Sequence, residues 1–190
     1  MPKLIIINGA SGAGKTFLLE QISTQDKEMV AIKKYTTRKP REYENPNTSN
    51  DLYFGCTVEQ VQEKKYSYPF KGHWYGIDSH EIDEMLARGK YPMVIVRDYP
   101  TIVSLKHDYG DDTLSFYIQG AYSGSELRKL LVDQGREMES VLDDIEKNKT
   151  NFDEYYKYLK QDLFDRFIFN YYDDSFLGQV EYFLEKDKVN

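Results

Sequence analysis

The chain has 190 residues, of which 40% are hydrophobic and 30% are charged, and its formal net charge is −7. This length and composition predict one folded domain rather than a disordered chain, and the acidic balance argues against a nucleic acid polymer as partner. No apolar run reaches the roughly 18 residues that a membrane span needs, and the single cysteine, Cys56, excludes an internal disulfide.

The first predicted element is a strand over residues 4–7, a continuous β-branched run typical of a strand buried on both faces. A glycine-rich loop follows, and residues 15–23 have helical character. The N-terminal residues lack the cleavage pattern of a signal peptide, so we expect a cytoplasmic protein.

The next part of the chain departs from this regular pattern. Residues 28–33 predict a short strand, whereas residues 35–51 are polar and rich in turn-forming types. Thr57 is expected to begin a short helix that ends near Lys64. Residues 66–77 are rich in aromatic side chains and predict short antiparallel strands. A capped helix then runs from Asp78 to Gly89.

The remaining elements alternate again between strands and helices. Strands are expected at residues 93–96, 113–118 and 167–169, and helices from Ser123 or Ser125, across residues 141–163, and at residues 175–184. Such alternation predicts an α/β fold with a parallel core sheet covered by helices on both faces. The 35–78 region should form a separate small lobe.

The loop after the first strand matches the G-x-x-x-x-G-K-[ST] pattern of a phosphate-binding loop. Glycines allow the backbone to wrap around a phosphate, and successive N–H groups then form an anion-binding nest at the start of the following helix. The lysine supplies a cation for the β- and γ-phosphates, and the final hydroxyl suits Mg²⁺. The residues expected to bind ATP are Gly9, Ala10, Ser11, Gly12, Ala13, Gly14, Lys15 and Thr16.

A second basic motif contains Arg38 and Arg41, which lie three residues apart beside Thr36, Thr37 and Pro40. Two guanidinium groups held close together suit a dianionic phosphate. A solvated basic loop would have the same spacing, and the residues alone leave both interpretations open.

With these motifs in order, the chain resembles the guanylate kinase family, in a resemblance that covers nearly the whole sequence. The matching segments are the phosphate loop, residues 36–41 with Glu42 or Glu44 after them, residues 51–54, residues 72–76, Asp98, residues 126–127 and residues 165–170.

The resemblance implies a P-loop kinase of three α/β/α layers, with a core at 1–33, 91–122 and 163–190, an acceptor-binding lobe at 34–90 and a helical lid at 123–162. It implies ATP as donor with Mg²⁺, held by Thr16. Asn170 resembles a donor-nucleotide contact. The implied acceptor-binding residues are Arg38, Arg41, Tyr53, Tyr75 and Asp98. For Tyr53, the corresponding tyrosine of the family aligns better with Leu52. Catalysis is expected to use Lys15, Arg38, Arg41 and Arg136.

Two departures from the family pattern concern the lid and the base pocket. The run from Leu130 to Gly135 lacks the lid arginines of the family. Of the two nearby arginines, Arg136 is better placed than Arg128 to substitute for a missing one, at Gln134. In the family, a carboxylate and small hydroxyl residues read guanine. The carboxylate position falls near Tyr66 in this chain, and the hydroxyl positions fall near Lys34 and Ile77. Of the base-reading residues, only Asp98 is kept.

Three functions follow from these observations. The first is ATP-dependent phosphoryl transfer to a nucleoside monophosphate, with GMP as the leading acceptor. The second is the same transfer to a phosphorylated sugar such as ribose 1,5-bisphosphate, which has no base to recognise. The third is a binding module that keeps the fold without catalysis; the intact phosphate loop argues against it, and the altered lid argues for it.

Overall fold

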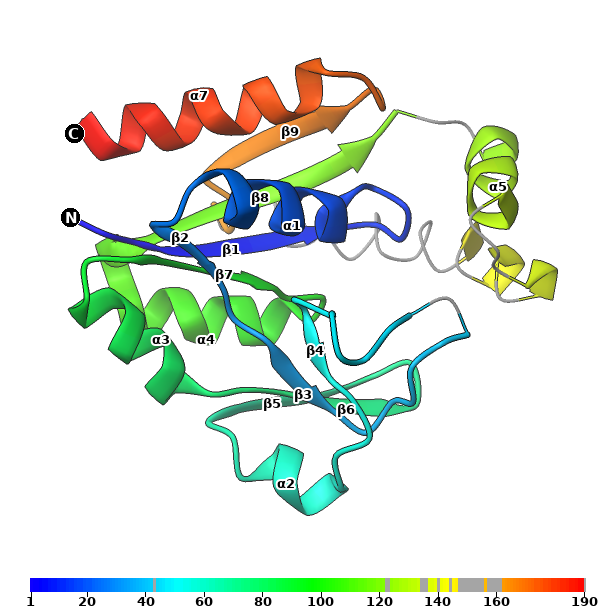
Figure 1. Ribbon diagram of the computed structural model, residues 1–190, viewed down its shortest axis with the longest axis horizontal. Helices are drawn as coiled ribbons and strands as arrows, with labels where there is room; N and C mark the ends of the chain where they lie inside the picture. The colour runs from blue at the N-terminus through cyan, green and yellow to red at the C-terminus, as the bar shows by residue number, and fades with distance from the viewer. Residues whose placement is uncertain are drawn as a thin grey trace. The chain divides into compact units, whose positions relative to one another are not determined.

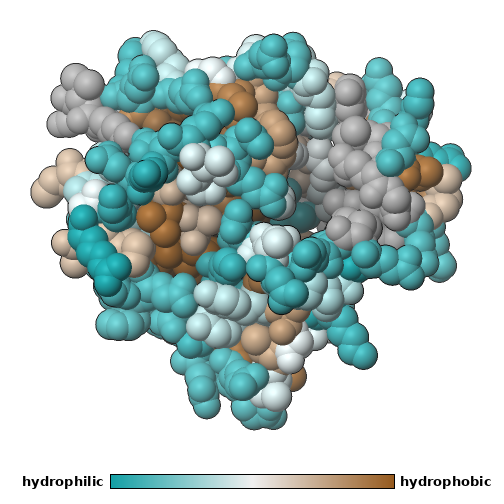
Figure 2. All heavy atoms as spheres, viewed as in Figure 1, coloured by the Kyte–Doolittle hydropathy of each residue, from teal (hydrophilic) through white to brown (hydrophobic). Residues whose placement is uncertain are grey.

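A computed structural model describes residues 1–42, 44–121, 124–133, 137–139, 141–143, 145–146, 156 and 162–189. Contacts within the chain divide it into two compact units, Met1–Ile7 with Thr16–Leu114, and Asn8–Lys15 with Ser115–Asn190. Each unit contains parallel strands together with helices, which confirms the predicted α/β class. Within the described part of the chain, no helix combines the length and apolar character needed to cross a membrane. The face seen in Figure 2 is mostly hydrophilic.

The first unit holds most of the elements. Their bounds are β1 (Leu4–Gly9), α1 (Lys15–Gln25), β2 (Met29–Ala31), β3 (Lys34–Thr36), β4 (Leu52–Tyr53), α2 (Val58–Gln62), β5 (Tyr66–Phe70), β6 (His73–Ile77), α3 (Ser79–Ala87), β7 (Tyr91–Ile95), α4 (Tyr99–Tyr109) and a 3₁₀ turn (Gly110–Asp112), with the end of β1 and the first residue of α1 belonging to the second unit.

Its parallel strands run in the order β2-β7-β1. Ile6 pairs with Val94, and Val30 pairs with Pro92. Ile6 and Val94 are fully buried, as the continuous apolar runs predict for strands covered on both faces.

A second, four-stranded sheet of this unit has the order β4-β3-β6-β5 and lies apart from the parallel strands, with α2 beside it (Figure 1). The predicted antiparallel strands over 66–77 are confirmed as β5 and β6. They are joined through Lys71 and Gly72, which both have positive φ, at 50° and 75°. Two consecutive positive φ values match the twist of a tight hairpin turn.

Both predicted helix caps are present in the first unit. The Thr57 side chain accepts from Gln60 N, and the Gln60 side chain accepts from Thr57 N, which together form a capping box. The Asp78 side chain accepts from His80 N at the start of α3. Helix α4 was not predicted, although Asp98 caps it and Pro100 occupies its first turn.

The second unit contains β8 (Thr113–Gly120, from Ser115 onward), α5 (Gly124–Asp133), β9 (Arg166–Asn170) and α7 (Ser175–Val189). Strands β8 and β9 are parallel, with Ile118 paired to Ile168. Asp165 joins them, because its carboxylate accepts from both N and Oγ of Ser115 at 2.7 Å. The predicted strands and the C-terminal helix are confirmed, whereas most of the helix predicted at 141–163 lies outside the described residues.

Candidate functional site

The phosphate loop joins β1 to α1 and has the backbone geometry that its glycines allow. Gly9, Gly12 and Gly14 have φ values of 144°, 78° and 92°. A Cβ on Gly14 would lie 2.5 Å from Asn170 Nδ2, and one on Gly9 would lie 2.3 Å from the Ile118 carbonyl oxygen. Glycine is therefore required here both by conformation and by close approach of neighbouring atoms.

Lys15 is the first residue of α1, and its side chain is buried. Its Nζ donates to the carbonyl oxygen of Ala10 at 2.5 Å, so the ammonium group lies across the loop. The amide of Ala13 donates to the same carbonyl at 3.3 Å. Thr16 follows in the first turn of the helix and is exposed.

Asn170, at the end of β9, lies directly against the loop. It is buried, and its Nδ2 donates to the Ala13 carbonyl oxygen at 3.1 Å. The structure thus brings Asn170 to the predicted loop, and the contact it makes there is with the backbone. A contact between Asn170 and a nucleotide stays a prediction.

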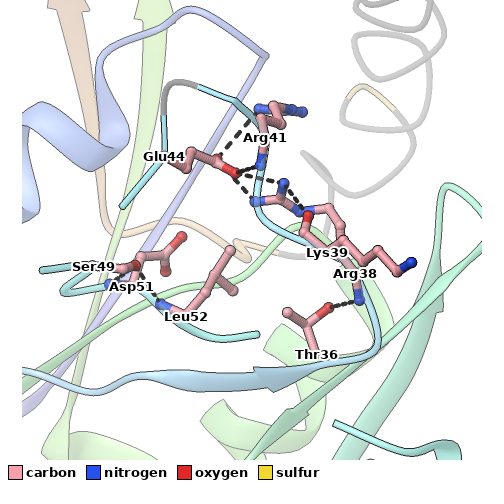
Figure 3. A network of polar contacts seen from close by, with 8 residues as sticks. All are labelled: Thr36, Arg38, Lys39, Arg41, Glu44, Ser49, Asp51 and Leu52. Carbon is pink, nitrogen blue, oxygen red and sulfur yellow. Dashed lines mark hydrogen bonds and ion pairs between the residues drawn. The ribbon is translucent and has the colours of Figure 1, made fainter. Parts of the chain in front are cut away.

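The first unit contains the second predicted cluster, Arg38 with Arg41, and both side chains meet one carboxylate (Figure 3). The Glu44 oxygens accept from Nη1 and Nη2 of Arg38 at 2.7 and 2.9 Å. Glu44 also accepts from the Arg41 amide at 2.8 Å, and Arg41 Nη1 lies 3.6 Å from Glu44 Oε1. The sequence placed Glu44 near this motif without predicting that it would join the two arginines.

The charges of Arg38 and Glu44 support each other. Burial opposes the charge of Arg38, yet the hydrogen bond to Glu44 leaves its pKa raised. Burial also opposes the charge of Glu44, but the hydrogen bonds from Arg38 and from the Arg41 amide hold its pKa below the ordinary value. Both groups are therefore ionised at neutral pH.

Tyr75 lies beside this cluster, and Tyr53 has other neighbours. Tyr75 is on β6, and its hydroxyl contributes to the raised pKa of Arg38. Tyr53 is 42% exposed on β4. The ring centroids of Tyr53 and Tyr35 lie 5.0 Å apart, and Lys33 Nζ lies 5.3 Å from the Tyr53 centroid. Of the two tyrosines, the structure brings Tyr75 to Arg38.

Two positions that the family resemblance assigned to base reading are engaged in structural contacts. Lys34 is buried and forms a short ion pair with Asp51, and burial lowers the lysine pKa. Tyr66 donates to Asp108 Oδ2 at 2.8 Å, and burial together with this bond raises its pKa to about 12. Lys34 thus joins β3 to the residue before β4, and Tyr66 joins β5 to α4, through contacts that the sequence did not indicate.

Asp98 serves as the N-cap of α4. Its Oδ2 accepts from Thr101 N at 2.9 Å and from Thr101 Oγ1 at 2.7 Å. The sequence placed Asp98 at the end of a central strand; β7 ends three residues earlier, and the carboxylate caps the helix that follows. Its contact with an acceptor or metal stays a prediction. No group of three or more His, Cys, Asp or Glu residues suited to a metal occurs among the residues described.

The two lid arginines differ in how far the structure defines them. Arg128 is exposed on α5, and its Nε lies 3.2 Å from Met138 Sδ. Arg136 and Gln134 lie outside the described residues. The substitution of Arg136 for a family arginine therefore stays a prediction.

Comparison with known proteins gives consistent matches. The family model described as guanylate kinase matches residues 1–186. Guanylate kinase of Bacteroides thetaiotaomicron is 27% identical over 145 residues, covering 74% of this chain and 70% of that protein. Guanylate kinase of Chlamydia caviae is 30% identical over 146 residues, covering 73% and 68%. The crystal structure of guanylate kinase from Anaplasma phagocytophilum matches with a TM-score of 0.66 at 17% identity, covering 100% of this chain and 87% of that one, which is a likeness of fold.

Proposed function

The chain belongs to the guanylate kinase family, and from that premise we propose that it transfers the γ-phosphoryl group of ATP to the phosphate of a nucleoside monophosphate, with GMP as the leading acceptor. In this reaction an acceptor phosphate oxygen bonds to the γ-phosphorus, the bond to the β-phosphate oxygen breaks, and ADP leaves. The chemistry depends on holding two anions in line and stabilising their charge.

On the donor side, Gly9 to Thr16 would hold the triphosphate. The positive φ values of the glycines and the position of Lys15 at the helix start favour an anion at this loop. Mg²⁺ in kinase sites is bound largely by substrate phosphates and water, so one exposed hydroxyl from Thr16 fits it. When bound, the ion would neutralise charge between the β- and γ-phosphates.

On the acceptor side, the observation that carries the proposal is the bidentate grip of Arg38 on the Glu44 carboxylate. A guanidinium that already holds one planar oxyanion has the geometry to bind phosphate oxygens with its remaining N–H groups. Arg41 and Tyr75 would complete this clamp. We include Tyr53 and Asp98 as acceptor contacts on family resemblance.

The division into parts follows the same premise. We propose residues 34–90 as the acceptor-binding lobe, 123–162 as the lid and the rest as the core. Lid closure would exclude water that could hydrolyse ATP, and Arg136 would supply positive charge to the transferring group.

A phosphorylated sugar is the second candidate acceptor, and the structural contacts of Lys34 and Tyr66 favour it. Side chains held by Asp51 and Asp108 are already hydrogen-bonded and would not replace the family's guanine contacts. An acceptor without a base would not need them. Such an acceptor would still use Arg38 and Arg41.

A coupled assay for ADP formation tests these alternatives with a panel of GMP, dGMP, other nucleoside monophosphates and ribose phosphates. Turnover with a nucleoside monophosphate is the expected result. Turnover with a sugar phosphate alone would replace the proposed acceptor. ATP binding without turnover on any acceptor would support the third function, a binding module.

A further inference from the structure

Tyr172, two residues after β9, contacts the phosphate loop from outside it. Its hydroxyl donates to the Gly12 carbonyl oxygen at 2.7 Å. Its amide donates to Asn170 Oδ1 at 2.7 Å, and the Nδ2 of the same asparagine donates to the Ala13 carbonyl at 3.1 Å. Two consecutive carbonyl groups of the loop are therefore held by the side chains of two residues that are themselves joined by a hydrogen bond.

These bonds determine where the loop amides point. In a trans peptide the carbonyl group and the next N–H group point in opposite directions. The Tyr172 hydroxyl thus orients the Gly12–Ala13 peptide, whose N–H donates within the loop to the Ala10 carbonyl oxygen at 3.3 Å, and Asn170 orients the Ala13–Gly14 peptide. The N–H of Gly14 consequently faces away from the asparagine, which is the orientation that an anion-binding nest requires.

The backbone around Tyr172 is built to keep its hydroxyl in this place. Tyr172 has a φ of 62°, which is uncommon for a bulky residue and is maintained only where surrounding contacts enforce it. Gly120 leaves room for the side chain, because a Cβ at this position would lie 2.5 Å from Tyr172 Oη but 3.5 Å from Cζ. An alanine at position 120 would therefore collide with the hydroxyl and would only touch the ring.

We propose that Tyr172 is a positioning residue for the phosphate donor: its hydroxyl, together with Asn170, holds the loop over residues 12–14 in the shape that binds a triphosphate before the nucleotide arrives. This inference rests on the proposed function for its ligand, and on the contacts within the second unit for its geometry. A loop that is already ordered binds more tightly, because ordering no longer opposes binding.

The test compares Tyr172→Phe with Tyr171→Phe. The control tyrosine is adjacent, is 58% exposed and stacks on Phe169. Hydrogen exchange is measured across residues 8–16 in nucleotide-free protein, and the Kd for ATP with Mg²⁺ is measured by calorimetry. We expect Tyr172→Phe to speed exchange of the loop and to raise this Kd by about 3- to 10-fold, the effect of one lost hydrogen bond. Tyr171→Phe should change neither value.

Gly120→Ala gives an independent route to the same contact. It should displace the hydroxyl and weaken ATP binding by about the same factor as Tyr172→Phe. When the two substitutions are combined, no further loss is expected, because the ring tolerates a Cβ at 3.5 Å. Losses that multiply in the double variant would contradict the proposed contact.

The two measurements, hydrogen exchange of the loop and ATP binding, separate this inference from the proposed function. Equal loop exchange in Tyr172→Phe and Tyr171→Phe, in a chain that binds ATP, overturns the positioning role and leaves the kinase proposal standing. A wild-type chain that binds no ATP overturns the kinase proposal. Faster loop exchange in Tyr172→Phe would then still establish that the tyrosine orders the loop.

Discussion

The Glu44 carboxylate is gripped by both Nη atoms of Arg38, at 2.7 and 2.9 Å, and it also accepts from the Arg41 amide. One acidic side chain thus contacts both arginines that we propose as the acceptor clamp, Arg38 through its guanidinium and Arg41 through its backbone amide. The Glu44 side chain is 22% exposed, so the ion pair of Arg38 with Glu44 is shielded from water more than an ordinary surface ion pair.

Glu44→Gln should destabilise the protein in a pH-dependent way. The pKa of Glu44 is lowered in the folded state, so its contribution is present above the unfolded pKa and is lost as pH falls through the folded pKa. We expect the variant to be less stable by about 1–2 kcal/mol at pH 7, with a difference that shrinks below about pH 4. Urea unfolding of both proteins across pH 3–7 measures it. A difference that does not change with pH would contradict the ionic character of the contact.

Arg38→Ala should impair use of the acceptor and leave ATP binding nearly unchanged. Loss of a bidentate phosphate contact should lower kcat/KM for the acceptor by about 10- to 100-fold, through a higher KM and a lower kcat. Arg38→Lys keeps the charge but not the planar fork, so it should recover only part of the activity. Steady-state kinetics with each substrate varied in turn measures this. Unchanged acceptor kinetics in Arg38→Ala would remove Arg38 from the site.

Lys34→Met should destabilise the protein strongly, because it leaves the Asp51 carboxylate without its buried partner. We expect a loss of about 3–5 kcal/mol, whereas Lys34→Met combined with Asp51→Leu should lose less. Lys65→Met is the control, since Lys65 is 55% exposed and pairs with Asp108 at 3.0 Å; its effect should stay below about 1 kcal/mol. Denaturant unfolding of these three variants and of Asp51→Leu alone measures these values. A double variant as unstable as the sum of its single substitutions would contradict a coupled pair.

Gly14→Ala should disrupt the phosphate loop without unfolding the protein. A Cβ at this position meets Asn170 Nδ2 at 2.5 Å, and φ is 92°. ATP affinity should fall by at least about tenfold. Gly178→Ala is the matched control, because its Cβ would meet nothing within 4 Å on helix α7. That change should leave ATP binding intact and raise stability by about 0.5–1 kcal/mol. Calorimetry with ATP and thermal unfolding measure both; equal ATP affinities would contradict the assigned role of Gly14.

Sequence reasoning succeeded where a local pattern dictates the structure. The apolar run at Leu4 to Ile7 and the glycine loop predicted a strand, turn and helix in order, and Thr57 and Asp78 marked helix starts correctly. Helix α4 was missed although local signals existed, namely Asp98 as a cap followed by Pro100.

Contacts between distant residues could not be predicted from local pattern. Lys34 and Asp51 are 17 residues apart, and their pairing depends on the register of β3 with β4. Tyr172 and Gly12 are separated by 160 residues, and their contact depends on the tertiary structure of the second unit. The arginine motif left both an anion site and a solvated basic loop open, and the role of Glu44 required the geometry of the loop.

Transfer of label from γ-³²P-ATP to GMP tests the central proposal most directly. The products are separated after incubation with the wild-type chain, with Arg38→Ala and without protein. Phosphoryl transfer predicts labelled GDP in the wild-type reaction, strongly reduced in Arg38→Ala and absent without protein. Label that stays on ATP, or that appears only as inorganic phosphate with no labelled GDP, would contradict it.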